Sequence, residues 1–395
     1  MKRLPFDYAL RNLGRSPTRL VASLLGSTLV VVLLLASVGF VRGMSRTLDQ
    51  PEGLHTNVII LGTGSEEGIE RSQIDAGIDT IAAASIRGLK QEGGVIFASP
   101  EIHMALPVRE SAGATRDLPA VIRGVRPVAL LVHPEVEIVE GRAPDAAQNE
   151  IMVGALAATR LGVPDERLGV GRTLFFDSRD WTIVGRFTAP NTVMDAEVWM
   201  PLIDLQVATK REASLSCVIV TLGADPQTGA RFADVDAFAK SRLDLEVSAL
   251  RERDYYASIS AFYAPIRVMV VATAVLIAAG GLMGGLNTMY AAFAARVREV
   301  GMLQALGFTR RAIVLSLTQE SVFAAACGAV IGAVIALTLL DGLAVRFSMG
   351  AFTLSIDAPV MLTGLVGGLV VGLVGAIPPA IRCLRLPIAE ALKSF

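Results

Sequence analysis

Few side chains in this sequence have types and spacings that could support chemistry, and most familiar arrangements of them are missing. The three histidines (His55, His103 and His133) share no metal-ligand spacing, and the three cysteines (217, 327 and 383) include no C-x-x-C pair. No G-x-x-x-x-G-K-[ST] loop, G-x-S-x-G turn or H-E-x-x-H helix occurs. The sequence therefore predicts no catalytic residue, no metal and no directly bound cofactor, and no ATP hydrolysis through a P-loop of its own.

The most suggestive group of side chains lies at residues 296–311, where charged residues surround a short apolar pattern. Val300, Leu303 and Leu306 are spaced so that they roughly share one face of a helix of about two turns. Gly307 suits the residue after a helix C-terminus, and Thr309 suits the N-cap of the next helix. The pattern predicts a short helix followed directly by a second one.

Such a helix, held outside a bilayer by arginines, indicates a cytosolic partner, with Leu303 as the side chain expected to enter a groove of that partner. The alternative is a tight connector lying against lipid headgroups, to which arginine is also drawn. Under the first interpretation the coupling residues are Arg296, Arg298, Glu299, Val300, Gly301, Leu303, Ala305, Leu306, Gly307, Arg310 and Arg311.

The elements around this loop are membrane-spanning helices. The chain of 395 residues is 52% hydrophobic and only 18% charged, with a mean hydropathy of +0.54, whereas soluble domains carry about 25% charged residues. Uncharged runs at residues 20–41, 268–295, 321–340 and 358–381 reach the length of roughly 20 residues that a bilayer requires. The first is too long for a signal-peptide core and is interpreted as an anchor. A net charge of −1 argues against a nucleic-acid partner.

Basic residues set the expected orientation of the spans. They are concentrated before the first run, in the 296–311 loop and after the last run, where they outnumber acidic residues. Because basic loops stay on the cytoplasmic side, both termini and this loop are predicted to be cytoplasmic, with residues 42–267 outside. We expect three regions: 1–48 with the N-terminus and first span, 49–250 as an extracytoplasmic domain, and 251–395 with spans two to four.

The exported segment alternates short β-branched stretches with helical patterns, which predicts an α+β domain. A hairpin is expected around Ser178, Arg179 and Asp180. The strand candidates are Asn57–Leu61, Val95–Ser99, Pro119–Gly124, Val136–Glu140, Thr173–Asp177, Trp181–Phe187, Glu197–Pro201 and Ser216–Leu222. The helix candidates are Ile69–Lys90, Val153–Leu161 and Gln227–Leu243.

Apolar stripes continue beyond the first span and before the second. They predict two helices that pack together as a stalk below the exported domain, through Met44, Leu48, Tyr255, Ile259 and Phe262; loose interfacial helices are the alternative. Glu320, one turn inside the third span, would either pair with an arginine of the loop or act directly in coupling. Several G-x-x-x-G pairs, such as Gly328 and Gly332, allow close helix contacts and are candidates for a dimer face.

At this point the sequence resembles a known family. The loop R-V-R-E-V-G-M-L-Q-A-L-G-F-T-R-R-A-I, followed by Gln319-Glu320, is similar to the signature of the FtsX/MacB-like (type VII) permeases of ABC transporters. Ala9–Arg19 and Arg385–Leu392 are similar to the beginning and end of that permease. Val139–Pro144, Glu150–Gly154 and Trp181–Gly185 resemble the MacB-like periplasmic core.

The resemblance implies a multi-pass protein of the bacterial cytoplasmic (inner) membrane that forms a dimer with a second copy or a paralogue. It implies a separate cytosolic ABC ATPase subunit that holds ATP and Mg and grips the loop, since the fused ATPase domain of MacB-type proteins does not match here. A membrane-fusion or other envelope protein is a further candidate partner. The implied function is mechanical extrusion or extraction of an amphiphile; the alternative is a non-transporting, FtsX-like regulator of cell-envelope hydrolases.

Overall fold

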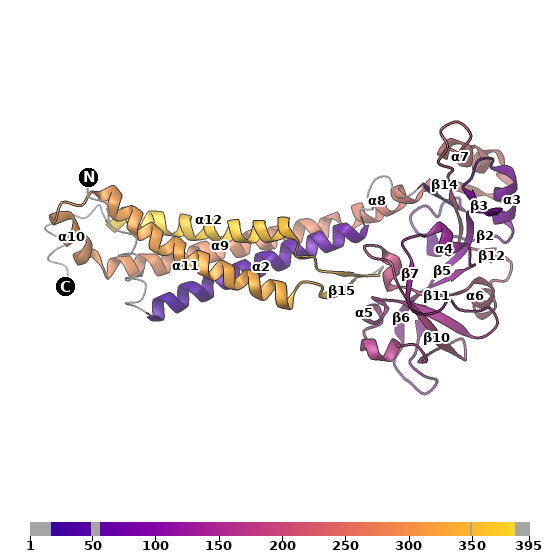
Figure 1. Ribbon diagram of the computed structural model, residues 1–395, viewed down its shortest axis with the longest axis horizontal. Helices are drawn as coiled ribbons and strands as arrows, with labels where there is room; N and C mark the ends of the chain where they lie inside the picture. Colours follow the sequence, from indigo (N-terminus) through magenta and orange to yellow (C-terminus); the bar gives the residue numbers. More distant parts are fainter. Residues whose placement is uncertain (1–16, 49–55, 348–349, 384–395) are drawn as a thin grey trace. The chain divides into compact units, whose positions relative to one another are not determined.

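The structure is a computed structural model that describes residues 17–48, 56–347 and 350–383 (Figure 1). The chain divides into two compact units, which are described separately. The membrane unit takes in the chain up to Arg42, residues 265–343 and the chain from Leu354 onward. The second unit, called the exported unit after its expected orientation, takes in residues 43–264 and also residues 344–353, which the sequence placed in a loop between the last two spans.

The membrane unit is a bundle of long apolar helices, drawn side by side in Figure 1. Four helices of the described chain are long and apolar enough to cross a membrane, at the places that the hydropathy predicted. The helices are α2 (Pro17–Leu48, whose last residues belong to the exported unit), α9 (Ala264–Ala294), α10 (Val297–Ala305), α11 (Arg310–Leu339) and α12 (Ala358–Cys383). Pro378 and Pro379 lie inside α12.

Glycines bring these helices into close contact within one chain. A Cβ atom added at Gly328 would collide with the side chain of Ser27 on α2, and one at Gly332 would meet the backbone of Thr28. Gly364 on α12 is likewise covered by Leu35 of α2. The glycine pairs that the sequence offered as dimer faces therefore serve, at these positions, contacts inside the bundle.

The exported unit is built on a ten-stranded mixed sheet, counted over the described residues. Its order is β14-β1-β13-β5-β6-β11-β8-β10-β7, with β9 also paired to β10. The strands of this sheet are β1 (Asn57–Gly62), β5 (Ala98–Val108), β6 (Leu118–Val125), β7 (Glu137–Gly141), β8 (Glu150–Gly154), β9 (Thr173–Phe176), β10 (Arg179–Thr188), β11 (Val198–Pro201), β13 (Cys217–Thr221) and β14 (Val247–Arg251).

Short elements surround the sheet. The remaining strands are β2 (Ile74–Asp75), β3 (Gln91–Glu92), β4 (Val95–Ile96), β12 (Ser214–Leu215), β15 (Ala344–Phe347) and β16 (Gly350–Thr353). The helices are α3 (Ile78–Ser85), α4 (Ala129–Val132), α5 (Ala157–Leu161), α6 (Leu202–Thr209), α7 (Phe232–Ser241) and α8 (Glu252–Phe262), with 3-10 turns η1 (Ile69–Arg71), η2 (Asp165–Leu168), η3 (Val193–Ala196) and η4 (Leu243–Leu245).

Strand β5 joins the two halves of the sheet. Its residues 98–101 pair antiparallel with β13, and its residues 102–108 pair antiparallel with β6. Beyond β6 the sheet becomes mixed, because β6 pairs parallel with β11 and β8 pairs parallel with β10. Strand β1 is buried along its whole length, which explains its continuous apolar sequence.

Three predictions about the exported domain are wrong in detail. The expected helix Val153–Leu161 begins inside β8, and only Ala157–Leu161 is helical. The expected helix Ile69–Lys90 is divided into η1, β2 and α3, and Gly77, with φ of +97°, ends any continuous helix before α3. The β9–β10 hairpin turns at Asp177 and Ser178, with φ of +47° and +59°, so Arg179 already pairs with Phe176. Two consecutive positive φ values are typical of a two-residue hairpin turn.

The segment between the last two spans is a β-hairpin that belongs to the exported unit. Strands β15 and β16 pair antiparallel, and the hairpin packs against α5 and η3. Arg160 of α5 donates a hydrogen bond to the carbonyl oxygen of Phe347. The rings of Phe347 and Phe352 lie 5.8 Å apart, and Phe352 is buried. A loop between spans is thus an ordered part of the exported fold.

Candidate functional site

The candidate coupling site is α10 and its connection to α11. Helix α10 ends in a Schellman motif at Gly307, whose φ is +88°. The Phe308 N–H donates to the Leu303 carbonyl at 3.1 Å, and the Gly307 N–H donates to the Gln304 carbonyl at 3.0 Å. The Thr309 side chain then accepts a hydrogen bond from the Ala312 N–H at 3.3 Å and caps α11. Both local signals in the sequence, Gly307 and Thr309, have the expected geometry.

One face of α10 is packed onto the membrane unit. Val300 is 3% exposed and lies in a cluster of apolar side chains that draws on α9, α11 and α12. Leu303 and Phe308 are partly buried and pack against the same cluster. The buried members are Phe293, Val300, Ile313, Leu317 and Ala380. The inner face of α10 is therefore buried against residues of three spanning helices.

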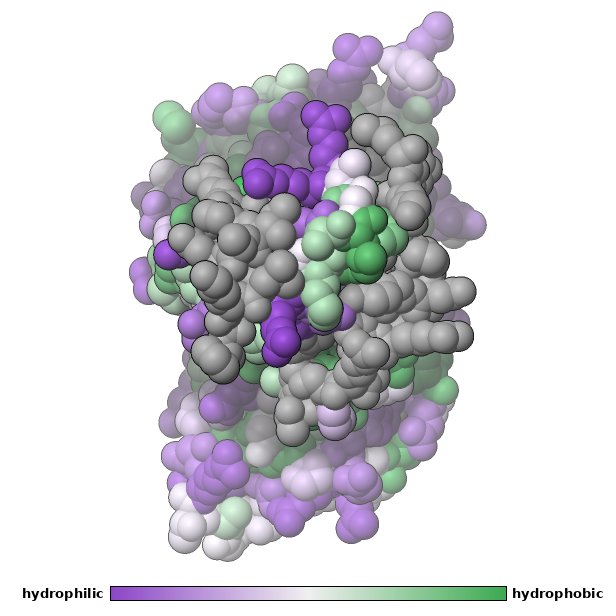
Figure 2. All heavy atoms as spheres, turned by 90° about the vertical axis from the view of Figure 1, so that its left-hand side faces the viewer, coloured by the Kyte–Doolittle hydropathy of each residue, from purple (hydrophilic) through white to green (hydrophobic). Residues whose placement is uncertain are grey.

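The position of Leu303 corrects the sequence interpretation, in which it was the side chain offered to a partner. The exposed apolar side chains are Met302 and Leu306, which are 49% and 65% exposed. They are four residues apart, so they lie on adjacent turns of the same side of the helix. Figure 2 shows the end of the molecule on the left of Figure 1, where strongly hydrophilic side chains lie beside a patch of hydrophobic ones.

Glu320 is held by an arginine of the loop. The Arg296 Nη1 atom lies 2.9 Å from Glu320 Oε2, and the Arg296 Nε atom lies 3.0 Å from Glu299 Oε2. Glu320 is only 5% exposed. A buried carboxylate requires such a partner, and the three side chains clamp the start of α10 to α11. This geometry supports the pairing role that the sequence left open for Glu320.

The remaining residues of the predicted site do not converge on one point. Gly301 is buried on the inner face of α10, and Ala305 is exposed at the end of the helix. Arg298, Arg310 and Arg311 are exposed, and no ion pair joins them to any residue in the described parts of the chain.

The predicted stalk residues occupy a different arrangement from the one expected. Met44, Leu48, Tyr255 and Ile259 are all buried, but Phe262 is 76% exposed, and the buried ring is that of its neighbour Tyr263. The Ile69 N–H donates to the Tyr255 hydroxyl at 3.5 Å, because α8 packs on the exported sheet beside β1 and β14.

The β15–β16 hairpin contacts both stalk segments. A Cβ atom at Gly43 of α2 would collide with the carbonyl oxygen of Thr353, so α2 can lie this close only with glycine there. The rings of Tyr263 and Phe347 lie 5.4 Å apart, edge to face. The hairpin therefore links the end of α2 to the residue that follows α8, a connection that the apolar stripes alone did not indicate.

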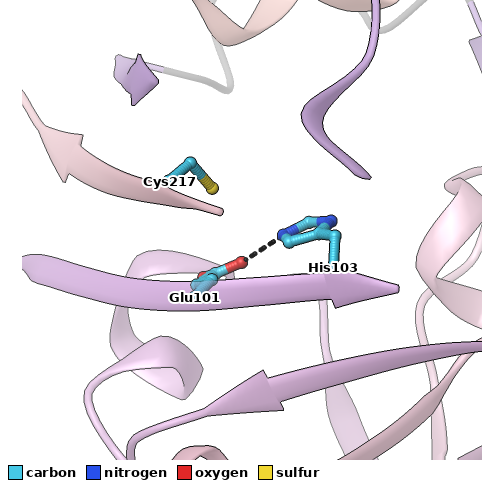
Figure 3. A group of neighbouring side chains, drawn as sticks. All are labelled: Glu101, His103 and Cys217. Atoms are coloured by element: carbon cyan, nitrogen blue, oxygen red, sulfur yellow. Dashed lines mark hydrogen bonds and ion pairs between the residues drawn. The ribbon is translucent and has the colours of Figure 1, made fainter. Parts of the chain in front are cut away.

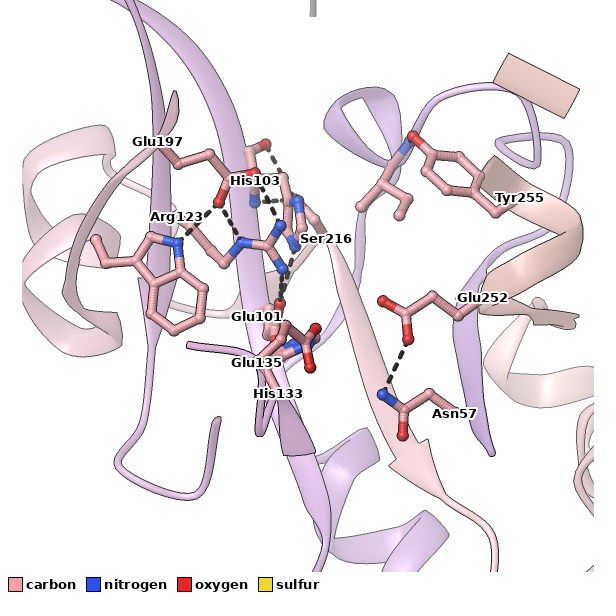
Figure 4. Close-up of polar contacts among 12 residues, drawn as sticks. Asn57, Glu101, His103, Arg123, His133, Glu135, Glu197, Ser216, Glu252 and Tyr255 are labelled. Atoms are coloured by element: carbon pink, nitrogen blue, oxygen red, sulfur yellow. Dashed lines mark hydrogen bonds and ion pairs between the residues drawn. The ribbon is translucent and has the colours of Figure 1, made fainter. Parts of the chain in front are cut away.

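The exported unit also holds a buried ionic cluster that the sequence did not reveal (Figure 4). Arg123 on β6 donates two hydrogen bonds to Glu197, at 2.7 and 2.8 Å, and one to Glu101 on β5, at 2.8 Å. His133 Nε2 lies 2.9 Å from the other oxygen of Glu101. The Trp199 indole N–H donates to Glu197 at 2.8 Å. The cluster connects strands on both sides of the β5–β6 junction.

Opposite charges dominate the electrostatics of this cluster. Burial alone would raise the pKa of Glu101, but His133 and Arg123 outweigh it and hold that pKa well below its usual value. Burial would lower the pKa of His133, yet Glu101 raises it to about 10. His133 is therefore charged at neutral pH, and both carboxylates have a cation within hydrogen-bond distance.

Glu101, His103 and Cys217 lie close enough to suggest a metal centre (Figure 3). The surroundings argue against that chemistry. The Arg123 guanidinium contacts the same Glu101 oxygen that His103 contacts, and a cation there would repel a metal ion. Burial raises the pKa of the Cys217 thiol well above its usual value, which disfavours the thiolate that binds metals. In the sequence, the one indication of the buried ionic cluster was a charged residue inside an apolar strand, as in Ala120–Val125.

A cavity of about 410 Å³ lies among the helices of the membrane unit. Helices α2, α9, α11 and α12 all contribute to its wall, which is mostly glycine and apolar side chains. Ser23, Ser27 and Thr288 supply hydroxyl groups. The cavity can take an apolar group of moderate size with few polar contacts.

Comparisons with known proteins match both parts of the chain. Residues 20–237 match the MacB-like periplasmic core domain, and residues 271–388 match the FtsX-like permease C-terminal region. The macrolide export ATP-binding/permease protein MacB of Shewanella sp. (strain W3-18-1) is 22% identical over 98% of this chain and 60% of that protein. The corresponding protein of Vibrio parahaemolyticus is 23% identical over 97% of this chain and 59% of that protein.

Two further similarities were found. An uncharacterized ABC transporter permease of Bacillus subtilis, YvrN, is 24% identical over 59% of this chain and 55% of that protein. The crystal structure of the periplasmic region of MacB from Actinobacillus actinomycetemcomitans matches with a TM-score of 0.37 at 10% identity, over 52% of this chain and 92% of that chain. This chain spans about 60% of the length of the MacB relatives that it matches.

Proposed function

We propose that a separate cytosolic ATPase moves this chain. The premise is that the chain belongs to the family of ABC transporter permeases with a MacB-like periplasmic core domain and an FtsX-like permease region. In this proposal the ATPase holds ATP and Mg, binds α10 and displaces it. The displacement passes through the spanning helices to the exported domain. The chain itself performs no hydrolysis and works as a mechanical transmitter.

The observation that carries the proposal is the two-sided character of α10. Its inner face, with Val300 and Leu303, is packed onto three spanning helices. Its outer face presents Met302 and Leu306 to the surroundings. An exposed apolar pair on a short helix suits insertion into a groove of a partner protein. The Arg296–Glu320 pair prevents α10 from moving independently of α11.

Continuous chain connects the moving helices to the exported unit at three places. Helix α2 runs without a break through Arg42 and Gly43, where the membrane unit ends and the exported unit begins. Helix α9 begins directly after Tyr263. The β15–β16 hairpin joins α11 to α12 and is itself part of the exported unit. The exported unit is therefore attached to all four spanning helices, which favours a mechanical role.

The substrate class that the membrane unit supports best is an amphiphile. The cavity among the spanning helices offers apolar walls and a few hydroxyl groups, a composition that suits an acyl chain or another apolar tail. A lipid, lipoprotein, peptide or drug with such a tail fits this description. The proposal also includes a dimer with a second permease copy, an envelope partner, and a cytoplasmic position for both termini.

The test compares two substitutions at one exposed position. Leu306→Asp places a charge where an apolar side chain would enter the partner, whereas Leu306→Met keeps an apolar side chain of similar size. We expect an ATPase subunit to co-purify with the tagged wild type and with Leu306→Met, and to be lost from Leu306→Asp. Membrane insertion of each variant is checked by protease protection of the exported domain.

Retention of the ATPase by correctly inserted Leu306→Asp would contradict the coupling assignment. Substrate class is tested separately, by measuring whether lipopeptides and macrolides change the ATPase rate of the reconstituted complex. A complex whose ATPase rate responds to neither, but which activates an envelope hydrolase, would favour the regulatory alternative over transport.

A further inference from the structure

A second recess in the membrane unit lies between α11 and α12 and is independent of the cavity described above. It has a volume of about 520 Å³. Its walls are apolar, formed by Val314 and Leu315 of α11 and by Ile377 and Ile381 of α12. Thr318 lies along the same wall. Leu315, Ile377 and Ile381 are 55%, 36% and 42% exposed, so the groove is open at the side of the bundle.

The mouth of this groove is strongly positive. Arg310 and Arg311, the first two residues of α11, line it. Neither has an ion-pair partner among residues 17–48, 56–347 and 350–383. The N-terminus of α11 adds the partial positive charge of its free N–H groups. Two arginines beside a helix N-terminus favour the binding of an anion at this mouth.

A buried hydroxyl group lies deeper in the groove. The Thr318 Oγ1 atom is buried and has no hydrogen-bond partner in the described structure. Thr318 follows Arg310 by eight residues, which is about 12 Å along the helix at 1.5 Å per residue. A ligand that fills the whole groove is therefore anionic at one end and extends about 12 Å along apolar walls.

We propose that this groove binds an anionic phospholipid of the cytoplasmic leaflet, with the phosphate at Arg310 and Arg311 and an acyl chain along the apolar wall. The location agrees with the chemistry. Arg310 and Arg311 begin α11, the helix that contains the third candidate span, and they belong to a loop expected on the cytoplasmic side, where anionic headgroups attract basic side chains.

Charge complementarity selects this occupant over the others. A neutral lipid would supply no counterion to the two guanidinium groups, which have no ion-pair partner in the part of the chain that the structure describes. A second copy of the chain would present its own arginines at the same level. Each basic residue near an anionic membrane surface contributes about 1 kcal/mol of attraction. Two of them should favour an anionic over a zwitterionic lipid by roughly 30-fold, which corresponds to about 2 kcal/mol.

The first experiment measures lipid binding to the full-length protein without any ATPase. The protein is purified in detergent, titrated with phosphatidylglycerol or phosphatidylcholine, and examined by native mass spectrometry. We expect phosphatidylglycerol to bind about 30-fold more tightly, and Arg310→Gln/Arg311→Gln to abolish the difference. Arg298→Gln removes an exposed charge of α10 that does not line the groove, so it should leave the preference unchanged.

The second experiment fills the groove and keeps its charges. Leu315→Trp should weaken phosphatidylglycerol binding at least tenfold. Val330→Trp is the control, because Val330 is 57% exposed on the same helix and does not line the groove. Inorganic phosphate at millimolar concentration should not compete, because it lacks the acyl chain.

Three results would overturn the proposal. Equal affinity for the two lipids in the wild type would show that the arginines select no headgroup. An unchanged preference in Arg310→Gln/Arg311→Gln would place the lipid elsewhere. Loss of ATPase co-purification from that variant, with lipid preference intact, would assign the two arginines to the protein partner. The lipid readout does not depend on the proposed function, so either can fail without the other.

Discussion

Replacing Arg123 with methionine should destabilise the exported domain strongly. Methionine is an unbranched side chain of comparable reach, but it provides neither the charge nor the three hydrogen bonds that Arg123 gives to Glu101 and Glu197. Glu197 is 3% exposed, so water cannot replace the lost partner. Removing one member of a buried ion pair costs about 3–5 kcal/mol. For a domain of roughly 200 residues, each kcal/mol lowers the melting temperature by about 2–4 °C, so we expect a decrease of about 6–20 °C.

The protein has a built-in probe for this measurement. It contains two tryptophans, Trp181 and Trp199, and both are buried in the exported domain. Tryptophan fluorescence of the full-length protein in detergent therefore reports the unfolding of that domain and not of the helical bundle. Trp199 is itself hydrogen-bonded to Glu197, so its emission should also shift in folded Arg123→Met.

A matched control distinguishes burial from the mere loss of an arginine. Arg142 also pairs with a carboxylate of the same domain, Glu150, but its side chain is 51% exposed. Exposed pairs contribute about 0–1 kcal/mol, so Arg142→Met should melt within about 4 °C of the wild type. Adding Glu197→Gln to Arg123→Met removes the unpaired charge and should recover part of the loss. The reasoning is refuted if Arg123→Met melts within about 2 °C of the wild type, less than the smallest decrease expected, or if Arg142→Met is equally destabilising.

Three other predictions can be checked with the same protein. The pKa of His133 is raised from 6.5 to about 10, so its contribution to stability is complete below pH 6.5 and is lost as the pH rises through 10. Melts followed by tryptophan fluorescence should show the free energy of unfolding fall by about 3 kcal/mol between pH 7 and 10. His133→Gln should remove most of this pH dependence. Gly307→Val should leave the ATPase bound but reduce transport, because a β-branched residue resists the φ of +88°. Gly307→Asn should retain transport, and equal transport by the two variants would count against a role for this turn. Asp225→Cys, at an exposed position, should react with an impermeant thiol reagent on intact spheroplasts, while the fully buried Cys217 does not; protection of the introduced cysteine from outside would contradict the expected orientation.

Local sequence was sufficient for the spanning helices and for the ends of α10 and α11. Length and hydropathy select the four spans because every backbone polar group in a bilayer must be paired within its own helix. Gly307 and Thr309 act through backbone conformation and a hydrogen bond to a residue three positions away. Interactions of such short range depend on neighbouring residues, and these are visible in the sequence.

The contacts of the candidate coupling site, the buried ionic cluster and the β15–β16 hairpin depend on residues far apart in the chain. Leu303 and Leu306 have the same chemistry and similar spacing, and only the packing of Phe293, Ile313 and Ala380 makes the first inward-facing and leaves the second exposed. Glu101 and Arg123 are 22 residues apart in the sequence, and the sheet brings their side chains within 2.8 Å of each other. The sequence predicted only a short loop where the β15–β16 hairpin lies, because the packing of the hairpin on the exported domain is a contact between distant segments. A single sequence records the residues that can make such contacts, but the partner of each is chosen by the tertiary fold.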